Sequence, residues 1–78
     1  MDEGERDQER EFLKRMGRRI RDLRGARGLS QEELGFAADR TQHYISQVEL
    51  GKRNPSTLTM RALCRALGVS LPELFDGV

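Results

Sequence analysis

Residues 30–51, SQEELGFAADRTQHYISQVELG, decide the fold of this 78-residue chain. Ser30 is followed three residues later by a glutamate, the spacing of a capping box, in which each side chain accepts a hydrogen bond from a backbone N–H that the first helical turn leaves free. This pattern predicts a helix over about 31–38. Thr41 can cap a further helix over about 42–50, because its hydroxyl can accept from an N–H of that helix's first turn. The stretch therefore predicts two short helices joined by a tight turn.

Two short helices in this arrangement have the geometry of a helix-turn-helix, a motif whose second helix lies in the major groove of DNA. Ile45 and Val48 give that second helix an inner face. The polar side chains that cannot all be buried with them are Gln42, His43, Ser46 and Gln47. This outer face is the candidate DNA-reading surface, and the alternative for the same residues is an ordinary solvated helix face.

Apolar residues three and four positions apart predict a helix on each side of this motif. The first covers about 12–26 and is followed by Gly28, which can adopt the left-handed conformation that ends a helix. The fourth covers about 56–67, and a second capping box at 70–73 opens a short last helix. No segment alternates with period two over a useful length. We therefore expect an all-α domain in residues 12–78, a compact bundle of five short helices.

Residues 1–11 differ in charge from the rest of the chain. They hold six acidic residues and two arginines, a net charge of −4, which leaves +5 on residues 12–78. With almost no apolar side chains, the segment cannot bury enough surface to offset the entropy of ordering. We expect either a frayed N-terminal tail or a solvated extension of the first helix, since Glu, Gln and Arg form helices well. The basic domain suits a polyanionic partner, although such a surplus also occurs on proteins that bind no nucleic acid.

Composition argues against several other classes of protein. The single cysteine, Cys64, cannot form an internal disulfide, which favours a reducing compartment, and we expect a cytoplasmic protein. No run approaches the roughly 18 apolar residues of a membrane span, and the start of the chain lacks the apolar stretch of a signal peptide. Cys64 and the only histidine, His43, fall on an inner and an outer helix face, so they cannot form a catalytic pair or a zinc site. We expect no enzyme activity, cofactor, metal or small-molecule ligand, and no membrane partner.

Several segments together resemble the Cro-type family of phage and bacterial repressors, whose fold is a lambda-repressor-like DNA-binding domain. They are LSQEEL at 29–34, YISQVE at 44–49, GKRNPS at 51–56, ALGVSL at 66–71 and ELF at 73–75. This resemblance implies a sequence-specific DNA-binding regulator of transcription. The chain departs at the turn, where the family usually has glycine and an aliphatic residue and this sequence has Asp39-Arg40. Aspartate tolerates a left-handed backbone, which keeps the turn possible.

The resemblance also implies roles for individual residues. Base edges would be read by Gln42, His43, Ser46 and Gln47. A glutamine amide donates and accepts at once, which matches N6 and N7 of adenine. Phosphates would be contacted by Gln31, Thr41, Tyr44, Lys52, Arg53 and Asn54. Arg24 and Glu49 match positions that form a structural ion pair between the first helix and the end of the third.

The C-terminal end of the chain is rich in apolar side chains. We expect a homodimer, because a monomer of this size cannot readily bury all of them. The residues concerned are Leu71, Leu74, Phe75 and Val78. Two copies related by a twofold axis would place their third helices in successive major grooves of a palindromic operator in double-stranded DNA. The alternative is an antitoxin or an adaptor-type protein-interaction module that uses the same fold.

Overall fold

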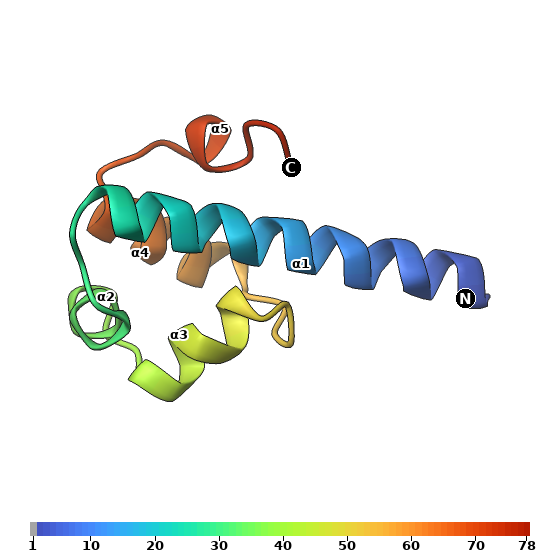
Figure 1. Ribbon diagram of the computed structural model, residues 1–78, viewed down its shortest axis with the longest axis horizontal. Coiled ribbons are helices and arrows are strands. Elements are labelled where there is room, and N and C mark those ends of the chain that lie inside the picture. The colour runs from blue at the N-terminus through green and yellow to red at the C-terminus, as the bar shows by residue number, and fades with distance from the viewer. Residues whose placement is uncertain (1) are drawn as a thin grey trace.

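The computed structural model describes residues 2–78, and within them it has five helices and no strand. The helices are α1 (Glu3–Ala26), α2 (Gln31–Ala37), α3 (Gln42–Glu49), α4 (Thr57–Leu67) and α5 (Leu71–Leu74). In Figure 1, α2 and α3 lie on one side of α1 and α5 on the other. The all-α prediction is confirmed, but α1 has 24 residues and is not a short helix.

The acidic N-terminal segment is helical. α1 begins at Glu3, where the side chain of Asp2 caps it by accepting a hydrogen bond from the N–H of Glu5 at 2.8 Å. Every residue from 3 to 11 is exposed. The structure therefore has the solvated helix extension rather than the frayed tail. Acidic residues in the first turn favour it by interacting with the positive end of the helix dipole. Figure 1 shows these turns projecting beyond the other helices.

The core draws on all five helices. Its fully buried side chains include Ile20 of α1, Leu34 of α2, Ile45 of α3 and Leu63 of α4. Cys64 is buried among them, as expected. Within residues 2–78, every buried side-chain nitrogen or oxygen has a hydrogen-bond partner.

One predicted dimer residue, Leu74, lies in this core and not on the surface. Its side chain is 0% exposed. α5 folds back toward α1, where Arg19 donates hydrogen bonds from Nη2 to the carbonyl of Glu73 at 2.7 Å and from Nε to that of Leu74 at 3.3 Å. The prediction of Leu74 as a dimer contact is therefore wrong, because this side chain packs in the core of its own domain.

The predicted helix signals are present at the expected positions. Both capping boxes form, at Ser30 with Glu33 and at Ser70 with Glu73. Gly28 has a φ of +68°, the left-handed conformation expected just beyond α1. The two capping boxes fix where α2 and α5 begin, and the left-handed glycine marks where α1 ends.

Candidate nucleic-acid interface

The turn between α2 and α3 brings the two helices into close contact. Asp39 adopts the left-handed conformation expected of it, with a φ of +56°. The N–H of Arg40 donates to the carbonyl of Gly35 at 2.7 Å. A Cβ atom at Gly35 would lie 2.6 Å from the carbonyl oxygen of Arg40, so only glycine fits without a shift of the chain. The turn therefore has the tight geometry of a helix-turn-helix, although Asp39 and Arg40 replace the glycine and aliphatic residue that are usual there.

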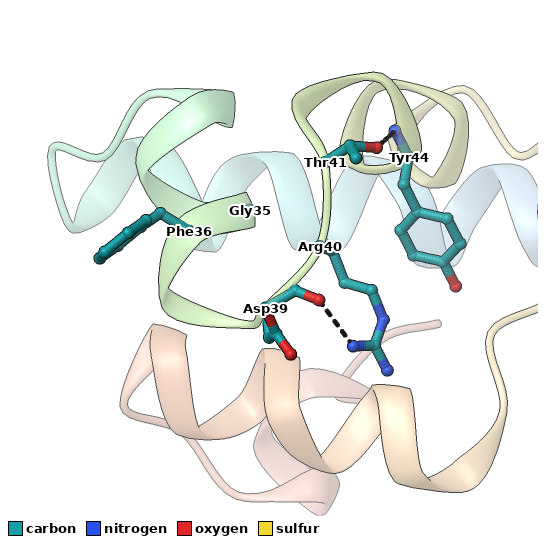
Figure 2. Close-up of a pocket in the computed structure, with 6 residues that line it drawn as sticks. All are labelled: Gly35, Phe36, Asp39, Arg40, Thr41 and Tyr44. Atoms are coloured by element: carbon teal, nitrogen blue, oxygen red, sulfur yellow. Dashed lines mark hydrogen bonds between the residues drawn. The ribbon is translucent and has the colours of Figure 1, made fainter.

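Arg40, in a position that is usually apolar, ties this turn to α4. Its Nη2 donates to the hydroxyl of the buried Thr59 at 2.8 Å, and its Nη1 donates to the carbonyl of Asp39 at 2.8 Å. Figure 2 shows the Arg40 side chain lying between the turn and α4, on the same side as the ring of Tyr44. Hydrogen bonds thus replace the apolar contact that an aliphatic residue would make.

α3 also packs closely against α1. A Cβ atom built at Gly17 would lie 2.5 Å from the carbonyl oxygens of both Val48 and Glu49. This contact was not among those predicted from the sequence. The available signal was a glycine beside Met16 in the apolar stripe of the first helix, at an inward position where a small residue permits close helix approach.

Arg24 and Glu49 form the predicted ion pair. Nε of Arg24 lies 2.7 Å from Oε2 of Glu49, and Nη2 lies 3.0 Å from Oε1. Only 16% of the Arg24 side chain and 4% of the Glu49 side chain are exposed. The hydrogen bond to Glu49 raises the pKa of Arg24, and burial acts in the opposite direction. Nη1 of Arg24 also donates to the carbonyl of Leu29 at 2.8 Å, which joins the α1–α2 loop to the pair.

Gln31, one of the predicted phosphate contacts, belongs to the same network. Its Nε2 donates to Oε1 of Glu49 at 3.1 Å. The amide is half-buried and points toward Glu49. The structure therefore gives this side chain an intramolecular partner that the sequence did not indicate.

The outer face of α3 is polar and accessible. Ile45 and Val48 are completely buried, as expected. Of the predicted base-reading residues, Gln42 and His43 are exposed, whereas Ser46 and Gln47 are half-buried. The structure thus brings all four onto one short helix, and the two nearest its N-terminus have the greatest freedom to contact a ligand.

The other predicted phosphate contacts flank this face. The hydroxyl of Thr41 caps α3 by accepting from the N–H of Tyr44 at 3.0 Å. The guanidinium of Arg53 lies 5.5 Å from the centre of the Tyr44 ring, a cation–π contact that holds the loop after α3 close to that helix. Lys52 and Asn54 of this loop are exposed. Polar and cationic groups therefore border both ends of α3.

Known proteins share this architecture. The family model described as a helix-turn-helix domain matches residues 15–76. The chain is 43% identical over 64 residues to the uncharacterized HTH-type transcriptional regulator y4dJ of Sinorhizobium fredii, a match covering 82% of this chain and 83% of that one. It is 38% identical over 61 residues to control protein C.BamHI of Bacillus amyloliquefaciens, covering 77% of this chain and 75% of the relative.

A solved structure agrees with these relatives. The restriction-modification controller protein C.AhdI from Aeromonas hydrophila matches with a TM-score of 0.82 and 41% identity, covering 85% of this chain and 96% of that chain. The present chain therefore belongs to the helix-turn-helix family of DNA-binding transcriptional regulators. None of the helices between residues 2 and 78 has the length and apolar character that crossing a membrane requires.

Proposed function

We propose that this regulator acts in the cytoplasm as a homodimer that binds a palindromic operator, with α3 in the major groove. One observation carries the proposal. The inner side of α3 is fixed by the close approach to Gly17 and by the Arg24–Glu49 pair, while Gln42 and His43 at its other end are exposed. A rigidly held helix with free hydrogen-bonding groups is suited to reading base edges.

Base reading and phosphate binding are assigned to different elements. Gln42, His43, Ser46 and Gln47 would contact bases. Thr41, Tyr44, Lys52, Arg53 and Asn54 would contact phosphates and set the register without reading sequence. For Gln31 we assign the phosphate contact to the backbone N–H groups at the start of α2, because its side-chain amide already donates to Glu49.

The proposed dimer surface is a patch of three large apolar side chains, each more than a third exposed. They are Phe12, Leu71 and Phe75, and we call them the Phe12 patch. The rings of Phe12 and Phe75 stack with their centroids 6.2 Å apart. The half-buried Val78 packs against the adjoining core. To enter successive major grooves, the two copies of α3 in this dimer would have to lie about 34 Å apart.

Selection of bound sites from random double-stranded DNA tests the proposal. We expect an inverted repeat whose half-sites lie about one helical turn apart. Enrichment of a single unrepeated site would contradict the twofold arrangement, and no enrichment by the chain alone would contradict autonomous sequence reading. The antitoxin or adaptor alternative predicts enrichment only when a second protein is added. The relatives of this chain, a transcriptional regulator and a control protein, do not favour that alternative.

A further inference from the structure

One face of α1 carries opposite charges at its two ends. Glu5, Gln8, Phe12, Arg15 and Arg19 follow one another at spacings of three and four residues, so they share a side of the helix. Glu9, three residues before Phe12, borders the same side. The part before Phe12 is acidic and the part after it is basic. The aromatic ring between them belongs to the exposed patch of the proposed dimer.

The acidic end of this face lies outside the domain proper. It falls in the helix extension before residue 15, where the family match begins. Glu5, Gln8 and Glu9 line a surface hollow together with Phe12, which places them on the Phe12 side of α1. Arg15 lies on the far side of the patch, three residues after Phe12, and is exposed.

Within the described residues 2–78, the side chains of Glu5, Glu9 and Arg15 form no ion pair. The ion pairs found among residues 2–78 join Arg10 to Asp7, Arg18 to Glu11 and Arg24 to Glu49. None of them includes Glu5, Glu9 or Arg15. Arg19 holds α5 through Nε and Nη2, so its remaining terminal nitrogen, Nη1, is not used in those bonds.

We propose that the α1 helices of two copies cross antiparallel at Phe12, so that the acidic end of each lies against the basic end of the other. This inference rests on the proposed homodimer. In a twofold contact, residue i touches residue j and j touches i. Glu9 and Arg15 each stand three residues from Phe12, or about 4.5 Å along the axis. Glu5 and Arg19 each stand seven residues away, so an antiparallel crossing places each acidic residue at the same height along the axis as an arginine of the other helix. A parallel one would bring like charges together.

The consequence is a dimer whose strength depends on salt and on the helix extension. Each dimer contains every pair twice, and each exposed pair of this kind strengthens association by up to about fivefold at low ionic strength. Such charges are screened over about 10 Å at 0.1 M salt. The apolar Phe12 patch would supply the part of the affinity that salt does not remove.

Charge reversal followed by sedimentation tests the pairing. Glu9→Arg and Arg15→Glu each place like charges opposite one another in both symmetric contacts, and we expect each to weaken dimerisation about tenfold at low salt. The double variant, Glu9→Arg with Arg15→Glu, should return to within about threefold of the original chain. Arg21→Glu is the matched control, because it lies nine residues from Phe12 and therefore on the opposite side of α1. Thermal melts establish that each variant is folded.

Each other outcome overturns a defined part of this inference. Single variants that dimerise normally at low salt would show that the charged ends do not meet, leaving the dimer itself intact. Weakened single variants without recovery in the double variant would contradict the antiparallel register. A change in DNA affinity with unaltered dimerisation would show that the extension acts on DNA instead. An original chain that is monomeric at every concentration, and also on DNA, would refute the homodimer and this pairing together.

Discussion

Arg24 near the end of α1 and Glu49 at the end of α3 are joined by two hydrogen bonds, Nε to Oε2 at 2.7 Å and Nη2 to Oε1 at 3.0 Å. Because Glu49 also accepts from Gln31, this one carboxylate connects α1, α2 and α3. The pair therefore helps to fix the position of α3 relative to α1 and α2.

Removing the carboxylate should destabilise the protein strongly. Glu49→Ala leaves a largely buried guanidinium without its partner, and we expect the free energy of unfolding to fall by about 3 kcal/mol. Chemical denaturation measures it. The control is Glu11→Ala, which breaks the exposed Arg18–Glu11 pair with its 3.7 Å separation and should cost less than about 1 kcal/mol. Equal stabilities of the Glu49→Ala variant and the original chain would refute the structural role of the pair.

A methyl group between α1 and α3 should be destabilising. In Gly17→Ala the new Cβ would meet two carbonyl oxygens at 2.5 Å, so the helices must separate, at a cost of about 1–3 kcal/mol. Gly25→Ala is the matched control, because nothing lies within 4 Å of its Cβ position, and it should gain about 0.5–1 kcal/mol from helix propensity. Thermal unfolding compares the two. The same sign of change in both variants would argue against close packing at Gly17.

Local signals in the sequence were sufficient for most of the fold. The capping serines at 30 and 70 and the glycine at 28 act through neighbouring backbone groups, so their patterns specify helix ends without knowledge of the tertiary structure. The apolar spacing likewise predicted the inner face of α3, including Ile45.

Long-range contacts account for what the sequence did not reveal. Whether Leu74 faces the core or a partner depends on where α5 folds back against α1, and the Arg19 contact that holds it joins residues 55 positions apart. Gln31 turns toward Glu49, 18 residues away, a partner that no pattern near α2 indicates. The helix extension before Phe12 has no apolar period, so propensity alone could not separate helix from frayed tail. The assigned base and phosphate contacts stay predictions.

The two capping boxes should make stability depend on acid. The backbone N–H groups of Ser30 and Ser70 donate to Glu33 and Glu73 and lower the pKa of both carboxyl groups. A carboxylate with a lowered folded-state pKa stabilises the fold above its unfolded value of about 4.3, and this contribution disappears as pH falls through the folded value.

Glutamine at both positions isolates this effect. The Glu33→Gln, Glu73→Gln variant can keep the capping bonds but cannot titrate, so its melting temperature should fall less between about pH 5 and pH 3. Glu32→Gln removes a carboxylate that belongs to neither box and serves as control. A double variant whose pH profile parallels that of the original chain would show that capping does not cause the acid sensitivity.

The central claim is that α3 reads bases while the loop after it holds phosphates. Binding of Gln42→Ala and Lys52→Ala to the selected operator and to random DNA, measured over a range of salt concentrations, tests it most directly. Gln42→Ala should lose about 1–3 kcal/mol on the operator and little on random DNA. Lys52→Ala should weaken both similarly and reduce the salt slope by about one unit. If Gln42→Ala instead weakens operator and random DNA equally, α3 is not the reading element.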